Sequence, residues 1–200
     1  MTIVDSSDEL GRRDRKKLET RTALERAALR LVAERGLAKV TVEDIAGAVD
    51  VSSRTFFNYF PSKEDALIGR SRMDEDELRD RLAAVPSDVP ALEALRLTML
   101  DVAEDIQERR EQWLLRLKVF EQNPSLLPRL VAGGSQTERA MATAIAERAP
   151  AAGFAELVTA VALAAFRTAV LRWSSQDGGP ELTGLVDEVF DRLAAGLPNP

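Results

Sequence analysis

The stretch between residues 52 and 63 gathers side chains that could hydrogen-bond to nucleic acid. It carries two hydroxyls, an amide, a phenol and two cations, on Ser53, Arg54, Thr55, Asn58, Tyr59 and Lys63. Such groups bond to phosphate oxygens and to base edges. The stretch holds no acidic residue, which suits a duplex carrying one negative charge per ~1.7 Å of its axis. It is therefore a candidate nucleic-acid-binding site.

Histidine and cysteine are both absent from the 200 residues. This excludes zinc fingers, Ser-His and Cys-His nucleophiles, disulfides and thiol redox chemistry. An enzyme would have to use paired carboxylates, with or without Mg²⁺, projecting inward from facing helices. The acidic run Asp74-Glu75-Asp76-Glu77 is consecutive, so its carboxylates spread around a helix. We predict no enzyme activity, no metal and no cofactor.

The net charge of −6 conceals an asymmetry. Residues 10–63 hold 12 Lys/Arg and 7 Asp/Glu, a balance of +5, whereas the rest of the chain holds 15 basic and 26 acidic residues. A basic module on an acidic body is typical of a polyanion-binding domain joined to a domain with another task. The alternative is a chance fluctuation of solvated charge.

Helical periodicity runs through nearly the whole chain, and aromatic residues make up only 5%. Abundant Ala, Leu, Glu and Arg favour helix over sheet. We therefore expect an all-α fold of about nine helices. They should cover residues 15–34, 42–49, 53–59, 62–84, 91–121 (with a kink midway), 125–131, 134–148, 154–175 and 181–196.

Two short helices around a tight turn should present the polar stretch. Thr41 and Asp44 are spaced as a capping box at the start of the first helix, with Asp in place of the usual Glu. Ser52 can cap the second helix, and Pro61 ends it. Apolar residues of the first helix can pack against Phe56, so the pair forms a helix-turn-helix whose second helix presents its other face.

Residues 20–67 resemble the DNA-binding domain of TetR-family transcriptional regulators, above all in the segment TVEDIAGAVDVSSRTFFNYFPSKEDAL. The resemblance implies a three-helix DNA-binding domain joined through a fourth helix to a larger ligand-binding and dimerisation domain. We accordingly expect a flexible arm over 1–14, a helix-turn-helix domain over 15–61 and a ligand and dimer domain over 62–200. The basic run over residues 12–17, where this arm meets the first helix, is either solvated or in contact with DNA.

The resemblance also assigns DNA contacts by position. Thr41 matches a phosphate-binding residue, Tyr59 and Lys63 match backbone clamps, and Arg21 could touch a phosphate. The recognition-helix positions that approach base edges are Ser53, Arg54 and Thr55, and Asn58 occupies a variable, often DNA-facing, position.

Two positions depart from the family pattern. Phe57 stands where the family commonly has a tyrosine that holds a phosphate, so its contact would be apolar, for example with a thymine methyl. Arg54 stands where many members have a small residue. It could read guanine, or it could be a phosphate contact or a solvated charge.

The helix expected over 154–175 is apolar almost all round, so it must be buried on every side. Burial between two copies of the chain would achieve this, as the resemblance implies; an ordinary core helix is the alternative. The candidate dimer residues are Leu157, Val161, Ala164, Ala165, Leu185, Val189 and Phe190. The longest apolar run, residues 157–166, falls short of the ~18 residues of a membrane span. We expect a cytoplasmic homodimer without membrane contact.

Candidate ligand-binding residues lie on the helices expected over 91–121 and 154–175, although each could equally be core. They are Met99, Trp113, Leu117, Phe120, Phe166, Val170 and Trp173. Such a pocket favours an amphipathic or hydrophobic ligand, and the stretch after Trp113 loosely resembles a TetR subgroup with acyl-CoA-like ligands. Multidrug-like cations are the next choice.

These features together predict a dimer that binds a palindromic double-stranded operator and represses transcription until a ligand releases it. The helix expected over 62–84 would be the lever between ligand and DNA. An activator would share every one of these features.

Overall fold

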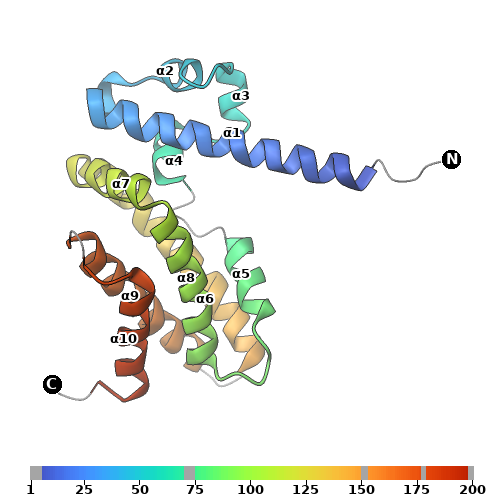
Figure 1. Cartoon of the computed structure of the whole chain (residues 1–200), viewed down its shortest axis with the longest axis vertical. Coiled ribbons are helices and arrows are strands. Elements are labelled where there is room, and N and C mark those ends of the chain that lie inside the picture. The colour runs from blue at the N-terminus through green and yellow to red at the C-terminus, as the bar shows by residue number, and fades with distance from the viewer. Residues whose placement is uncertain (1–5, 70–74, 150–152, 177–178, 198–200) are drawn as a thin grey trace. The chain divides into compact units, whose positions relative to one another are not determined.

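The computed structural model describes residues 6–69, 75–149, 153–176 and 179–197, and every regular element within them is helical (Figure 1). The expectation of an all-α fold is confirmed, with ten α-helices in the described ranges against about nine predicted. The chain divides into two compact units. The first unit comprises residues 1–69 and 114–127, and the second comprises residues 70–113 and 128–200.

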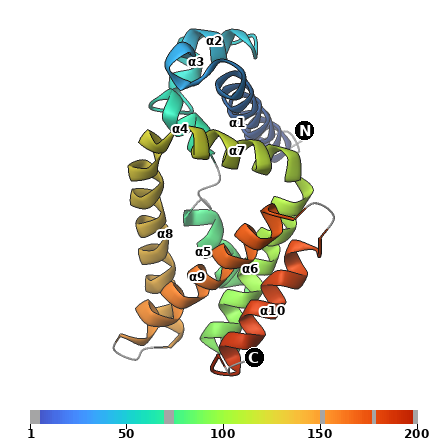
Figure 2. The same cartoon turned by 90° about the vertical axis from the view of Figure 1, so that its left-hand side faces the viewer.

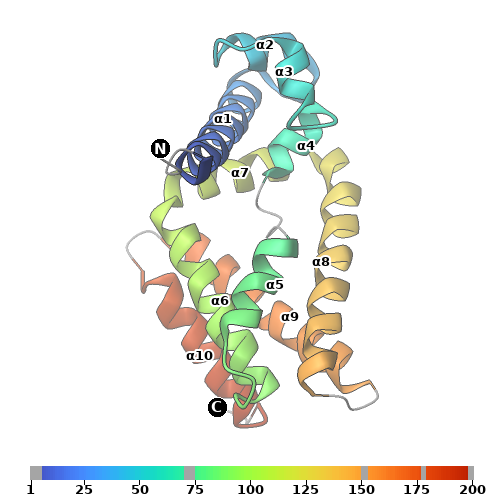
Figure 3. The same ribbon diagram turned by 90° about the vertical axis from the view of Figure 1, so that its right-hand side faces the viewer.

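The first unit contains α1 (Ser6–Arg35), the 3₁₀ turn η1 (Leu37–Lys39), α2 (Val42–Gly47), α3 (Ser53–Phe57) and α4 (Lys63–Ile68). Figure 3 shows these helices grouped together. The later part of α7 (Arg110–Gln122) and the turn η3 (Pro124–Leu126) also belong to this unit. The shared core includes Leu24, Ile45, Phe56, Val119 and Leu126. The boundary expected from the sequence, between residues 61 and 62, does not include residues 114–127 in the DNA-binding domain, although they belong to the first unit.

The first helix is longer than its apolar pattern predicts. It begins at Ser6, so residues 6–14 of the expected flexible arm are helical, whereas residues 1–5 lie outside the described part of the chain. At the other end, Gly36 follows α1 with a φ of 83°. A positive φ suits glycine, and the helix ends where the Arg35-Gly36 pair predicts.

The predicted continuous helix over 62–84 is wrong. The structure has α4 up to Ile68 and a separate helix α5 (Glu75–Ala84), with residues 70–74 outside the description. Gly69 follows α4 at φ 56° and ψ −157°, a conformation essentially restricted to glycine. A Cβ on Gly69 would lie 2.6 Å from Nη2 of Arg116. The chain therefore leaves the helix where a side chain from α7 comes close.

The second unit contains α5, α6 (Ala91–Glu108), the first turn of α7, α8 (Leu127–Arg148) from Pro128 onwards, α9 (Phe154–Ser174) and α10 (Leu182–Ala194). Helices α6, α9 and α10 pack side by side (Figure 2). Leu95, Met99, Phe166, Trp173 and Phe190 lie in their shared core.

Two sequence expectations about helix continuity in the later part of the chain meet different outcomes. The kink within 91–121 is confirmed, because α6 and α7 are separated at Arg109. The separate helices expected over 125–131 and 134–148 are wrong, since α8 runs unbroken through Gly133 and Gly134. In the loop expected over 176–180, residues 177 and 178 lie outside the described ranges.

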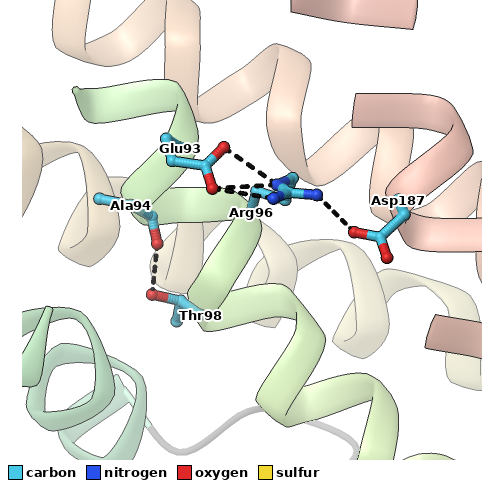
Figure 4. A network of polar contacts seen from close by, with 5 residues as sticks. All are labelled: Glu93, Ala94, Arg96, Thr98 and Asp187. Carbon is cyan, nitrogen blue, oxygen red and sulfur yellow. Dashed lines mark hydrogen bonds and ion pairs between the residues drawn. The ribbon is translucent and has the colours of Figure 1, made fainter. Parts of the chain in front are cut away.

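An ion network joins α6 to α10 (Figure 4). Arg96 on α6 donates from Nε to Oε2 of Glu93 at 2.9 Å and from Nη1 to Oδ1 of Asp187 on α10 at 2.6 Å. On the same helix, the buried hydroxyl of Thr98 donates to the carbonyl of Ala94 at 2.8 Å. Partly exposed pairs of this kind contribute little net stability, so the buried apolar faces hold the three helices together.

Candidate nucleic-acid interface

The start of α2 is fixed by the capping box that the sequence predicts. The Thr41 hydroxyl accepts from the backbone N–H of Asp44 at 3.1 Å, and the Asp44 carboxylate accepts from the backbone N–H of Thr41 at 2.9 Å. The Thr41 hydroxyl also donates to that carboxylate at 2.8 Å. These hydrogen bonds from the Thr41 backbone and side chain lower the pKa of Asp44 below its ordinary 3.8. Asp44 is therefore ionised at neutral pH, as the cap requires.

The short helix α3 is held against α2 by a cap, a turn and an aromatic anchor. Ser52 caps it by accepting from the N–H of Thr55 at 3.1 Å. Asp50 adopts a φ of 57°, and the N–H of Val51 donates to the Ala46 carbonyl at 3.0 Å. Phe56 is fully buried in the core of the first unit. The helix-turn-helix geometry expected from the sequence is thus present.

The outward side of α3 carries the polar groups that the sequence singles out. Arg54 and Asn58 are exposed, whereas Ser53, Thr55 and Tyr59 are half-buried. Two of the hydroxyls have neighbours, with Ser53 donating to Glu43 at 3.5 Å and Thr55 lying 2.9 Å from the Ser52 hydroxyl.

Phe57 lies beside this polar group and is 55% exposed. Its ring meets that of Phe56 edge to face, with centroids 5.6 Å apart. An aromatic ring left largely in water on this helix is consistent with the apolar DNA contact expected for this position.

Lys63 has a structural role that sequence reasoning missed. Its Nζ donates to the carbonyls of Leu37 at 2.8 Å and Val40 at 2.7 Å, tying the start of α4 to the connection between α1 and α2. An ammonium group has three donors, so one hydrogen is left for a phosphate. The contact depends on the backbone path after α1, which no local pattern around residue 63 reveals.

Replacing Lys63 with Ala should therefore reduce both stability and DNA affinity. Hydrogen bonds to a charged group contribute ~1.5–3 kcal/mol each, so thermal unfolding should show a clear loss. Lys39→Ala is the matched control, because Lys39 is exposed. If both variants unfold at the wild-type temperature, the two carbonyl contacts are not stabilising.

Arg21 is positioned by two neighbours. Its guanidinium lies over the Phe60 ring, 4.8 Å from the centroid, and its Nε lies 3.4 Å from Oε1 of Glu25. About a third of the side chain stays exposed, so N–H groups remain available for a phosphate. The structure thus presents Arg21 as a partly fixed cation.

The candidate ligand residues do not all come together. Met99, Phe166, Val170 and Trp173 are buried in the core of the second unit, and Trp113 packs against it. Leu117 and Phe120 belong to the first unit instead, where Phe120 packs against that unit's core. Arg110, which sequence reasoning missed, stacks over Trp173 at 4.4 Å from the ring centroid.

The candidate dimer residues also separate into two groups. Leu157 is 64% exposed and Val161 is 37% exposed. For Leu185 and Phe190 the structure corrects the expected interface role, because both side chains are buried in the core of their own chain. The three remaining residues are half-buried: Ala164, Ala165 and Val189.

By length and composition α9 could cross a membrane, and only 33% of its most apolar window is buried. The core helix of a soluble protein also passes this test, so a single such helix is weak evidence for a membrane span. Within the single chain, α9 therefore leaves an apolar surface uncovered.

Together, the capped helix pair, the polar face of α3 and the basic charge balance of residues 10–63 define a helix-turn-helix DNA-binding protein. The family described as "Bacterial regulatory proteins, tetR family" matches residues 25–68, and the family described as "MftR C-terminal domain" matches residues 89–198. The chain belongs to the TetR family of transcriptional regulators. This membership favours a regulator over the carboxylate enzyme considered above.

Similar proteins support the same assignment. The HTH-type transcriptional regulator TcmR of Streptomyces glaucescens is 33% identical over 143 residues, which span 68% of this chain and 63% of TcmR's own length. The fatty acid degradation regulator FadR of Bacillus halodurans has a similar fold, with a TM-score of 0.62 at 20% identity over 90% of this chain and 97% of its own. FadR of Thermus thermophilus, a repressor solved in complex with lauroyl-CoA, also has a similar fold, with a TM-score of 0.57 at 23% identity. The match covers 90% of this chain and 96% of that FadR chain.

Proposed function

We propose that this regulator is a cytoplasmic homodimeric repressor that binds a palindromic operator and is released by an amphipathic ligand. The observation that carries the proposal is the outward face of α3, where exposed Arg54 and Asn58 lie beside exposed Phe57 on a capped, core-anchored helix. A recognition helix of this kind reads base edges in the major groove.

The exposed stripe of α9 supports the dimer. Phe154, Leu157, Val161, Ala164, Thr168 and Leu171 recur at alternating spacings of three and four residues, the period of a helix-helix seam. Four of the six are large apolar residues that are 37–64% exposed. A second copy related by a two-fold axis would cover the stripe with the same stripe. It would also present two recognition helices to two half-sites.

The proposed ligand class is acyl-CoA-like. The second unit offers an apolar interior with aromatic residues and an arginine stacked on Trp173. The T. thermophilus neighbour was solved with lauroyl-CoA, although at its identity it informs only the fold. An acyl chain would suit the apolar side chains, and a cation would suit the phosphates of CoA. Multidrug-like cations remain the second candidate.

Release from operator DNA tests the ligand class. Labelled operator fragment bound by the protein would be titrated with acyl-CoAs of increasing chain length, free CoA and a hydrophobic cation. Release that strengthens with chain length and is absent for free CoA supports the proposal. Release by the cation alone would favour the second candidate. Higher transcription of neighbouring genes after deletion would support repression, and lower transcription would support activation.

Arg54 carries the prediction on base specificity. Its side chain is exposed, so its guanidinium can reach a guanine. Arg54→Ala should relax preference at one base pair per half-site, which corresponds to about 1–3 kcal/mol of discrimination. Selection of binding sites from a random library measures this. A uniform loss of affinity across all sites would make Arg54 a phosphate contact instead.

A further inference from the structure

Glu25 and Arg116 form a buried ion pair inside the first unit. In the described part of the chain they are the only charged residues that are buried, at 4% and 6% exposure. Nη2 of Arg116 on α7 lies 3.5 Å from Oε2 of Glu25 on α1. Nε of Arg116 donates to the Leu67 carbonyl in the last turn of α4 at 3.1 Å. One side chain of α7 therefore holds both α1 and α4.

The same carboxylate of Glu25 also contacts Arg21, the candidate phosphate contact on α1. Its other oxygen, Oε1, lies 3.4 Å from Nε of Arg21. Glu25 thus lies between two guanidinium groups, one buried and one a third exposed. Since Arg21 also stacks over Phe60, its position is set from two sides. Phe60 in turn packs against Phe56 of α3, with ring centroids 5.6 Å apart.

Gly69 provides the space for this pair. A Cβ there would lie 2.6 Å from Nη2 of Arg116 and 2.9 Å from Oε2 of Glu25. Both distances are shorter than a Cβ contact allows, so any larger residue would displace the ion pair. The break after α4 and the buried pair are therefore parts of one arrangement.

We propose that Arg116 and Glu25 are positioning residues that hold Arg21 for contact with an operator phosphate. Arg116 neutralises the buried Glu25 and fixes its carboxylate, and the carboxylate fixes the guanidinium of Arg21. A long cationic side chain that is already ordered loses less conformational freedom when it meets a phosphate. This inference rests on the proposed function, because it requires that the first unit bind DNA.

A double-mutant cycle on operator affinity tests the proposal. The variants are Arg21→Ala, Arg116→Met and the pair, measured at several salt concentrations and well below their unfolding temperatures. Each single change should weaken binding by about tenfold, and the double variant should be no more than about twofold weaker than either, because residues acting as a unit are not additive. Both single variants should also reduce the slope of log affinity against log salt concentration, called the salt slope below. The reduction should be roughly two for a dimer, because each subunit loses one phosphate contact.

Lys118→Met is the matched control, because Lys118 is an exposed cation on the same helix. It should leave affinity and salt slope near the wild-type values. If Arg116→Met fails to fold, Glu25→Gln replaces it in the cycle, because the amide keeps the shape of the side chain and loses its charge. Glu25→Gln should likewise weaken binding by about tenfold and be non-additive with Arg21→Ala.

The outcomes separate this proposal from the proposed function. Additive losses near a hundredfold in the double variant would overturn the positioning role, as would an Arg116→Met protein that loses thermal stability but keeps wild-type affinity and salt slope. An Arg21→Ala protein with normal affinity would also overturn it while leaving operator binding intact. If wild-type protein shows no salt-sensitive operator binding, the proposed function itself fails.

Discussion

Replacing Leu157 with Glu should convert the protein to a monomer and weaken operator binding by at least ~100-fold. Leu157 is 64% exposed in the apolar stripe of α9, so the change should leave the fold of each chain intact. In a two-fold dimer the two new carboxylates would be buried in one interface, and burying an unpaired charge costs several kcal/mol. A monomer presents only one recognition helix and loses the second half-site.

Sedimentation measures the change in mass, and operator titration measures the loss of affinity. Val131→Glu is the matched control, because Val131 is an apolar residue of 67% exposure on α8, outside the α9 stripe. It should remain dimeric and bind operator. A Leu157→Glu protein that stays dimeric would show that the α9 stripe is not the interface.

The neighbouring residues Phe56 and Phe57 should respond to alanine in opposite ways. Phe56 is fully buried and 5.6 Å from the Phe60 ring, whereas Phe57 is 55% exposed. Deleting a buried phenylalanine side chain costs ~3–5 kcal/mol, a large share of the ~5–15 kcal/mol that stabilises a typical domain. Phe56→Ala should therefore lower the unfolding temperature sharply and abolish DNA binding at physiological temperature.

Phe57→Ala should leave the unfolding temperature within a few degrees of wild type, because exposed substitutions change stability by about 0.5 kcal/mol or less. Its effect should appear in operator affinity, and it should disappear on operators in which deoxyuridine replaces the contacted thymine, because that replacement already removes the methyl group. Thermal unfolding and operator titration of both variants check these expectations. Equal unfolding temperatures would mean that α3 does not pack on the side that the structure shows.

The two helices of the helix-turn-helix could be predicted from the sequence because their signals are local. The capping box at Thr41, the serine cap at Ser52 and Pro61 act within one turn of the backbone. The buried position of Phe56 follows from the same short pattern. The capped helix-turn-helix therefore follows from residues that lie close together in the sequence.

The break at Gly69 could not be predicted in this way. An apolar and charged pattern compatible with helix continues on both sides of it, and one glycine in such a pattern is often tolerated. The structure places the ends of the Glu25 and Arg116 side chains where a Cβ of residue 69 would lie, and Gly69 has a φ of 56°. Glu25 and Arg116 lie 91 positions apart in sequence, so only the tertiary arrangement reveals their effect. Conversely, Gly133 and Gly134 suggest a break that α8 does not make.

The larger unit was predicted less well because one apolar stripe can serve either core or interface. Leu185 and Phe190 on α10 have the pattern of a surface stripe, yet they face α6 and α9 of the same chain. On α9, apolar residues on all sides could not show which face remains uncovered. Burial distinguishes them, since Ala162 and Phe166 are buried whereas Leu157 is exposed.

Binding of the purified protein to the DNA upstream of its own gene and of neighbouring genes tests the central claim most directly. The protein would be titrated against these fragments at salt concentrations from about 50 to 200 mM, the range over which several phosphate contacts change affinity by ~10³–10⁵. The account predicts saturable binding of one dimer to an inverted repeat, weakening steeply with salt. Binding that is absent, or that shows no preference for any inverted repeat, would contradict it.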